Sequence, residues 1–155
     1  MRHFLSLVVV LLLSLSAGAA EPVRVVHAFV ALCDNASQGI QKVPGRIGDG
    51  DDPAANLYWG CSDGLRSVFK RHPQWKTVPA AVPQALQGVV LERLVFRHAK
   101  TGVVLVADAY RGREIRRCIG DFFSAAAGVL ATEVDVAGTP VKAGGAADLV
   151  AYLGH

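Results

Sequence analysis

Polar side chains of catalytic or ligand-binding type follow the apolar runs of this chain, at the points where the runs end. In an open α/β sheet, ligands bind outside the carboxyl ends of the strands, because exit loops and helix N-termini meet there. We therefore expect these side chains to meet at one edge of a sheet and to form a working site. The side chains at the three clearest run ends are Cys33, Asp34, Asn35, Asp108, Tyr110 and His155.

His155 and Cys33 are the candidates for catalysis. His155 follows a glycine at a predicted strand end, where the backbone can turn and present an imidazole. Imidazole titrates near neutrality and serves as the general base for a cysteine or serine nucleophile. Cys33, at the end of another predicted strand, is the nucleophile that this hypothesis would use. The alternative is that Cys33, like Cys118, is a small residue of the apolar core.

The other polar candidates would bind a ligand rather than react with it. They are Asp34, Asn35, Asn56, Tyr58, Trp59, Asp108 and Tyr110. Each has a structural alternative, because Asp and Asn commonly cap helices or form Asx turns. Buried Tyr and Trp, in turn, commonly anchor a core with a bonded polar tip. His27 lies inside an apolar run and is interpreted as structural.

The loop from Asp49 to Asn56 is rich in oxygen ligands, which suits a calcium ion. The EF-hand order fails there because Pro53 stands where the third ligand should be, so a solvated turn is the alternative. The cysteine spacings match no zinc pattern. The chain also has no phosphate-binding glycine motif and no G-x-S-x-G elbow. We expect no metal site and no cofactor.

Three apolar runs, at 23–32, 103–107 and 149–153, are predicted to form the strands that position these side chains. Such runs belong to strands covered on both faces, as in parallel sheets. Helices are predicted at 61–72 and 113–123, where apolar residues recur at helical spacing. The prediction is a three-layer α/β domain of Rossmann-like type, with a mainly parallel sheet and flanking helices.

Other segments leave alternatives open. Residues 89–96 favour a strand that the turn at 99–102 folds back onto the next run, and a helix over 84–97 is the alternative. Residues 132–147 are predicted to be a loop or a minor hairpin. The stretch 35–56 is a loop of about 20 residues, which is uncommon in a compact domain and often functional.

The first 20 residues have the layout of an export signal. Arg2 and His3 begin the chain, an apolar run covers 4–15, and small residues at 17–20 suit cleavage. Residues 21–155 are then a single domain, periplasmic or secreted, with no membrane segment after signal cleavage. The formal charge of +3 is too small to indicate nucleic-acid binding. The 3 cysteines are an odd number, so at least one forms no bridge within the chain.

The words HAFVALCDN, NLYWG, VADAYRG and DLVAYLGH resemble those of a family of uncharacterised exported bacterial proteins with a caspase-like, cysteine-peptidase-like layout. The resemblance covers residues 25–155. It implies that one strand delivers a histidine, matched by His155, and that a later strand delivers the cysteine nucleophile. No residue follows His155, so the resemblance implies an incomplete domain, the N-terminal part of a longer one. We therefore expect no peptidase activity from this chain.

A binding role is the alternative to a cysteine hydrolase. On that hypothesis the domain is non-catalytic and periplasmic, and it binds a ligand or partner through the loop at 35–58. The sequence indicates neither the substrate nor the partner.

Overall fold

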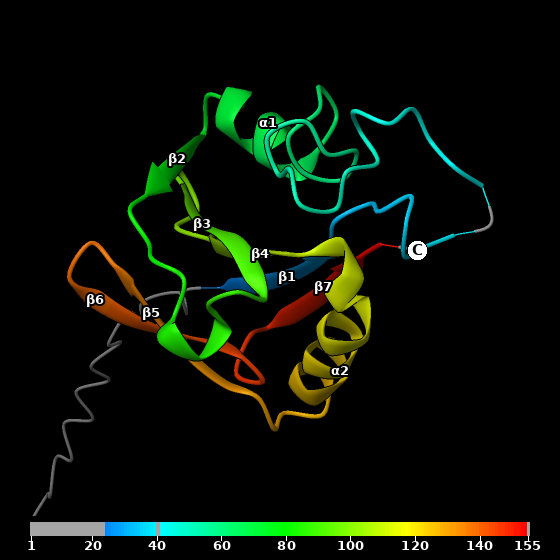
Figure 1. Cartoon of the computed structure of the whole chain (residues 1–155). Coiled ribbons are helices and arrows are strands. Elements are labelled where there is room, and N and C mark those ends of the chain that lie inside the picture. Colours follow the sequence, from blue (N-terminus) through cyan, green and yellow to red (C-terminus); the bar gives the residue numbers. More distant parts are fainter. Residues whose placement is uncertain (1–23, 40, 155) are drawn as a thin grey trace, which may run out of the picture.

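The computed structural model describes residues 24–39 and 41–154 (Figure 1). The predicted export signal at 1–20 and the candidate base His155 lie outside this part of the chain. The α/β class predicted from the sequence is confirmed, since helices and strands both contribute to the described domain. Within the same residues, no helix combines the length and the apolar character needed to cross a lipid bilayer.

A five-stranded sheet forms the middle of the domain. Its strands are β1 (Val25–Ala31), β2 (Trp75–Val78), β3 (Val90–His98), β4 (Val104–Tyr110) and β7 (Leu149–Leu153). Their spatial order is β2-β3-β4-β1-β7. β1 pairs in parallel with β4 and β7, whereas β3 is antiparallel to β2 and β4. The sheet is therefore mixed, and the predicted mainly parallel sheet is wrong for the half containing β2 and β3.

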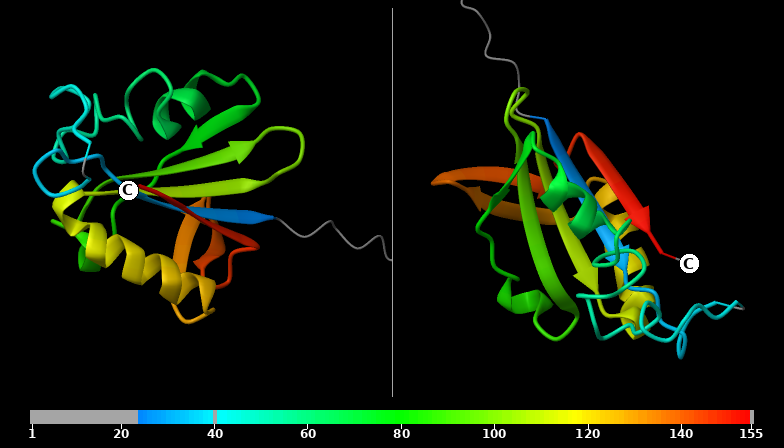
Figure 2. Two further views of the ribbon diagram at one scale, coloured as in Figure 1. Left: turned by 90° about the vertical axis from the view of Figure 1, so that its right-hand side faces the viewer. Right: turned by 90° about the horizontal axis from the view of Figure 1, so that it is seen from above.

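The two faces of the sheet are covered by different elements. α1 (Leu65–Arg71) packs on one face, together with the segment around Trp59. α2 (Ile115–Ala126) lies on the other face beside a hairpin formed by β5 (Ala131–Val136) and β6 (Thr139–Gly144) (Figure 2). We call these two sides the α1 face and the α2 face.

Side chains of β1 alternate between the two faces, which explains why its whole run is apolar. Ala28 and Val30 belong to the apolar cluster of the α1 face. Phe29 and Ala31 belong to a cluster on the α2 face. A strand covered on both sides requires apolar residues at nearly every position. The same holds for β4, all of whose residues are buried.

The helical spacing at 113–123 predicted α2 correctly apart from its ends. A short 3-10 turn, η2 (Gly112–Glu114), precedes the helix. Cys118 and Ala125 are buried against the sheet, while Phe123 on the outer side is 63% exposed. The helix predicted at 61–72 forms only over α1, because the chain before it is held in turns.

The sequence predictions for the remaining segments were correct in some places and wrong in others. The strand prediction for 89–96 is correct, and the turn at 99–102 does return the chain onto β4. The alternative helix is wrong, since only the short 3-10 turn η1 (Gln84–Leu86) forms there. The minor hairpin is confirmed as β5 and β6. β2 was not predicted.

Candidate functional site

The sequence pattern placed Asp108 and Tyr110 in the exit loop of a strand, and the structure does not. Both are inside β4, and their buried side chains are on the α2 face, where they line a cavity. β4 extends beyond the predicted apolar run at 103–107. The carboxylate of Asp108 and the phenol of Tyr110 can be buried in the strand because both are hydrogen-bonded. The expected cluster of these two residues with Cys33, Asp34 and Asn35 is therefore wrong.

Asn56 ties the long loop after β1 to the end of that strand. Its side-chain Oδ1 accepts hydrogen bonds from the backbone N–H groups of Cys33 (3.0 Å) and Tyr58 (3.2 Å). Its Nδ2 donates to the carbonyls of Cys33 (2.8 Å) and Asp49 (2.9 Å). The side chain is fully buried and fully used. We conclude that Asn56 shapes the loop instead of facing a ligand.

Asp34 and Asn35 form turns within the same loop. Asn35 exchanges two hydrogen bonds with the backbone of Val43, donating to its carbonyl and accepting from its N–H. Asp34 Oδ1 accepts from the N–H of Ala36, an Asx turn. A Cβ at Gly112 would collide with the Asp34 side chain, so glycine is required where the two loops touch. The structural alternative given for these residues is the one that the geometry supports.

Trp59 is a core anchor of the α1 face. Its ring is fully buried, and its Nε1 donates to Glu92 Oε2 over 2.6 Å. Glu92 in turn accepts from Arg66 over 3.0 Å, which joins α1 to β3. Tyr58 is half-buried and packs against the same apolar cluster.

The geometry around Cys33 does not favour a thiolate. Cys33 is buried at the end of β1, and burial together with the nearby charge of Asp34 raises the pKa of its thiol. Nucleophilic cysteines have a lowered pKa and an accessible sulfur. None of the cysteines, all of which the structure describes, forms a disulfide. The proposed partner of Cys33, His155, lies outside the described residues.

The oxygen-rich loop at 49–56 is occupied by its own contacts. Asp49 Oδ1 and Asp52 Oδ1 each accept from a backbone N–H two residues on. Asp51 forms ion pairs with Arg111 and Arg113, and the hydrogen bond from Arg111 is the main cause that lowers its pKa. No group of three or more His, Cys, Asp or Glu side chains able to hold a metal ion occurs among the described residues.

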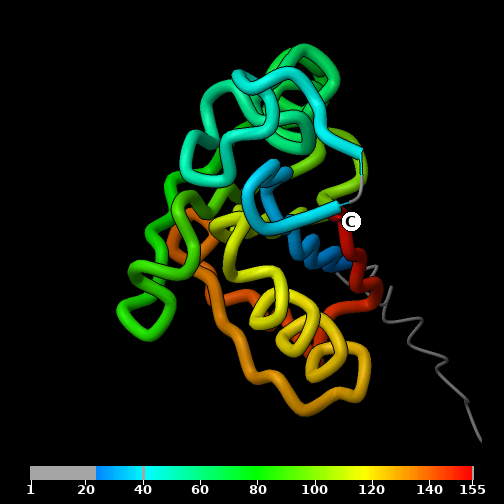
Figure 3. The backbone as a smooth tube through the Cα atoms, turned by 45° about the vertical axis from the view of Figure 1, so that its right-hand side comes forward, coloured from blue at the N-terminus to red at the C-terminus, as the bar shows by residue number. Residues whose placement is uncertain are grey.

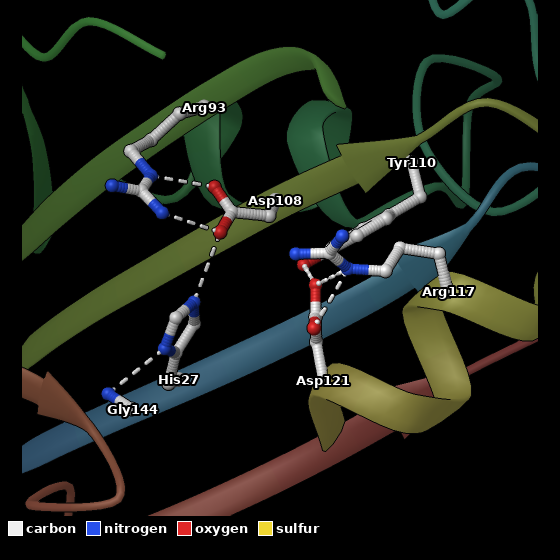
Figure 4. Close-up of polar contacts among 7 residues, drawn as sticks. All are labelled: His27, Arg93, Asp108, Tyr110, Arg117, Asp121 and Gly144. Carbon is white, nitrogen blue, oxygen red and sulfur yellow. Dashed lines mark hydrogen bonds and ion pairs between the residues drawn. The ribbon is translucent and has the colours of Figure 1, made fainter. Parts of the chain in front are cut away.

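A buried ionic network crosses the α2 face of the sheet (Figure 4). Arg93 on β3 donates two hydrogen bonds to Asp108 on β4, from Nε and from Nη2, each 2.6 Å long. His27 on β1 lies 3.1 Å from the same carboxylate through its Nε2. The Arg93 and Asp108 side chains are only 2% and 1% exposed. Three adjacent strands thus contribute one charged side chain or imidazole each.

The hydrogen bonds define the tautomer of His27 and favour the charged form of Asp108. The backbone N–H of Gly144, at the end of β6, donates to His27 Nδ1 over 3.0 Å. Nδ1 must therefore present a lone pair, so the proton of a neutral imidazole is on Nε2 and points at Asp108. Burial alone would raise the pKa of Asp108. The hydrogen bonds from Arg93 and His27 outweigh that effect and hold the pKa below its ordinary value.

A second polar group connects β4 to α2. The Tyr110 hydroxyl donates to Asp121 Oδ2 over 2.9 Å, and Arg117 Nε donates to both Asp121 oxygens over 2.9 Å. Burial, with the charges of Asp108 and Asp121, raises the pKa of Tyr110 far above its ordinary value. Tyr110 is consequently a permanent hydroxyl donor, and Asp121 a carboxylate already supplied with donors.

The two polar groups line the same cavity, of about 290 Å³. The sheet provides its floor, including His27, Arg93 and Asp108. Its sides come from η1, from α2 and from residues 130–133 at the start of the hairpin. The cavity therefore lies in the α2-face layer, between a helix and a hairpin that cover the sheet incompletely.

His27 and Arg93 were missed as site residues by the sequence prediction. His27 is the one polar residue of β1 and was interpreted as structural, whereas the buried Arg93 of β3 was left without comment. The signal that could have found them is the coincidence of three ionisable residues, at 27, 93 and 108, inside predicted buried strands, because buried charges must be paired.

Comparisons with known proteins leave the site without a precedent: no family model, no curated protein and no solved structure matches this chain.

Proposed function

We propose that this protein is a non-catalytic α/β domain that binds a small molecule in the cavity of the α2 face. The observation that carries the proposal is the position of the His27–Arg93–Asp108 network, which lies at the floor of a cavity instead of in closely packed core. Small-molecule sites are concave, mostly apolar, and supplied with a few converging polar groups. This cavity has that composition.

Stability alone does not account for the network. Burying an ion pair costs desolvation energy that its attraction only just repays, and apolar residues of equal volume often stabilise a core as well or better. Tight apolar packing would also close the cavity. Ionic side chains held rigidly beside a space of about 290 Å³ are therefore better explained by a ligand that uses them.

In this proposal the loop at 35–58 has a supporting role. Its polar side chains bond to its own backbone, as the contacts of Asn35 and Asn56 show. The loop follows β1 at the end of the sheet where β7 also ends, as Figure 3 shows. The cavity on the α2 face replaces it as the candidate binding surface.

A fragment screen with a blocked control tests the proposal. Ala85 is exposed at the cavity wall on η1, and Ala81 is exposed nearby but does not line the cavity. We expect fragments that shift the backbone NMR signals of residues 130–133, and we expect Ala85→Trp to abolish these shifts while Ala81→Trp preserves them. A screen without such hits, or hits that survive Ala85→Trp, would refute the proposal.

A cysteine hydrolase of the caspase-like type is the second candidate. The observation that favours it is the parallel pairing of β1 with β7, which brings Cys33 and Gly154 to the same end of neighbouring strands. The raised pKa and the burial of Cys33 oppose it. We expect no turnover of a mixed peptide library by the purified chain.

The matched control for that assay is a second buried cysteine. Cys118 is buried against the sheet on α2, and burial raises its pKa as well. Peptide turnover that disappears in Cys33→Ala but persists in Cys118→Ala would make the chain an enzyme and Cys33 its nucleophile. The absence of turnover in all three proteins agrees with a binding domain.

Export is a proposal of its own, supported by the basic start and the apolar run of residues 1–20. Expression in a bacterium with an outer membrane tests it. We expect the protein in the periplasmic fraction, with an intact mass that corresponds to loss of about 20 residues. Protein that keeps Met1 and stays in the cytoplasm would contradict export.

A further inference from the structure

The cavity of the α2 face has no unused acceptor among its buried carboxylates. Asp108 accepts two hydrogen bonds from Arg93 and one from His27. Asp121 accepts from Tyr110 and from Arg117. A cationic or donor-rich ligand would have to displace these contacts, so the part of the cavity beside Asp108 and Asp121 does not favour one. Glu133, on the exposed side, is the remaining carboxylate of the lining.

Beside these two carboxylates, the unused side-chain hydrogen-bonding capacity consists of donors. Arg93 is held on Asp108 by Nε and Nη2, and its third nitrogen, Nη1, has no hydrogen-bond partner among the described residues (Figure 4). Arg117 is anchored through Nε alone, and its two Nη groups are likewise unpaired within that part of the chain. Both guanidinium groups are oriented in advance by carboxylates, which reduces the entropy lost on binding.

Apolar side chains form the other part of the lining. Phe29 comes from the sheet, Leu86 from η1 and Leu130 from the segment before β5. The Phe29 ring also stacks on His27, with ring centroids 4.2 Å apart. A ligand that satisfies both parts of the lining has acceptor oxygens at one end and an apolar body at the other.

We propose that this cavity binds a small organic monocarboxylate with an aromatic or branched apolar body. The inference rests on the proposed binding function and adds the class of ligand to it. Two arginines are paired with two aspartates, so these four groups have no net charge, although the Arg117 side chain is 52% exposed. The remaining N–H groups of Arg93 and Arg117 can donate to a carboxylate. The lining has no excess positive charge for a phosphate dianion, because Glu133 adds one further negative charge.

Binding of benzoate and its neutral and dianionic analogues tests the ligand class. With the purified chain, we expect benzoate to bind at least about tenfold more tightly than benzamide, because only benzoate accepts hydrogen bonds as a charged group. We expect a similar preference over phenyl phosphate, because the lining lacks the excess positive charge that a dianion requires. Dissociation constants come from NMR titration. Equal affinity of benzamide would overturn the carboxylate class but leave the cavity as a binding site. Tighter binding of phenyl phosphate would identify a phosphate site instead.

Variants of α2 provide the matched comparison. Arg116 and Arg117 are both exposed, but only Arg117 lines the cavity. We expect Arg117→Gln to weaken benzoate about tenfold or more and Arg116→Gln to leave it nearly unchanged. Equal weakening by both would show that only general charge attraction operates and would overturn the proposal.

Glu133 gives a change of the opposite sign. This exposed residue of β5 lines the same cavity and carries a negative charge that repels an anion. Glu133→Gln is therefore expected to tighten benzoate binding, and weaker binding would contradict the proposed ligand. If neither benzoate nor any member of the fragment screen binds, the proposed function itself fails, which separates that result from a wrong ligand class.

Discussion

Asp108 balances the charge of the buried Arg93 guanidinium (Figure 4). In Asp108→Asn, Arg93 keeps its charge in a site that is 2% exposed but loses the opposite charge. Breaking a buried ion pair in this way costs about 3–5 kcal/mol. We expect the free energy of unfolding, measured by urea denaturation, to fall by that amount.

Asp51 provides the control for this substitution. Its ion pairs with Arg111 and Arg113 are exposed to solvent, where such pairs contribute little. We expect Asp51→Asn to leave the unfolding midpoint nearly unchanged. Equal losses of stability in the two variants would show that burial does not determine how much the Asp108–Arg93 pair contributes.

Acid should weaken the same interaction over a definite range of pH. The folded-state pKa of Asp108 lies below its ordinary value, which is about 3.9. The stability that this carboxylate contributes is therefore complete above about pH 5 and is lost as the pH falls through the lowered pKa. Urea denaturation at several pH values should show a constant gap between wild type and Asp108→Asn near neutrality. Below about pH 4 the gap should narrow, and a gap that widened there would contradict the assigned direction.

The sequence revealed which residues are chemically unusual better than it revealed where they lie in the fold. Asp108 and Tyr110 were selected as candidates and both line the cavity, but the apolar pattern ended the strand too early and placed them in a loop. Arg93 is one of two charged residues in the otherwise apolar stretch VVLERLVF, and its partner on β4 becomes apparent only through strand pairing. Hydrogen-bond partners distant in the chain cannot be read from local periodicity.

At the scale of elements, the long loop after β1 depends on one amide. Asn56→Ala would leave the buried N–H and carbonyl of Cys33 without their partner. Each unsatisfied buried group costs about 1–3 kcal/mol, so we expect about 2–4 kcal/mol of lost stability. Hydrogen exchange followed by mass spectrometry should show that the substitution accelerates exchange, relative to wild type, more in the loop than in β3 and β4.

A second asparagine of the same loop serves as the comparison. Asn35 bonds to Val43 near the surface, and its contacts are only partly buried. Asn35→Ala should accelerate exchange locally and change the global stability less than Asn56→Ala does. The reverse order would show that burial does not rank the two contacts.

Elements with strong periodicity were predictable, and those defined by pairing were not. Residues 113–123 repeat apolar side chains at helical spacing, so α2 followed from the sequence. β2 has only four residues, two of them exposed, and it exists because β3 offers an edge. Strand direction likewise depends on the length of connections, which is why a mixed sheet was mistaken for a mainly parallel one.

At the scale of the whole molecule, the apolar clusters are connected through the central strands. β1 and β4 contribute residues to the cluster of the α1 face and to both clusters of the α2 face. Loosening one layer therefore exposes strands that the other layer needs. We expect a single unfolding transition, with equal urea midpoints from far-UV circular dichroism and pulse proteolysis. An earlier midpoint for cleavage within β5 and β6 would show that the hairpin unfolds alone.

The cavity is a property of this whole arrangement, and no segment of sequence encodes it. Its lining comes from the sheet, η1, α2 and the start of the hairpin. Each of these segments is locally ordinary, and the space exists only because α2 and the hairpin leave part of the sheet uncovered. Sequence patterns predict which face of an element is buried but not how completely its neighbours cover it.

The placement of the two tryptophans determines which part of this protein intrinsic fluorescence can monitor. Trp59 and Trp75, the two indoles of the chain, both pack on the α1 face. The cavity on the opposite face is lined instead by Phe29 and Tyr110. Tryptophan emission would follow unfolding of the α1 side yet stay unchanged while a ligand occupies the other side. A fluorescent reporter must therefore be added at the cavity, for instance as Leu86→Trp, before optical titration can detect binding.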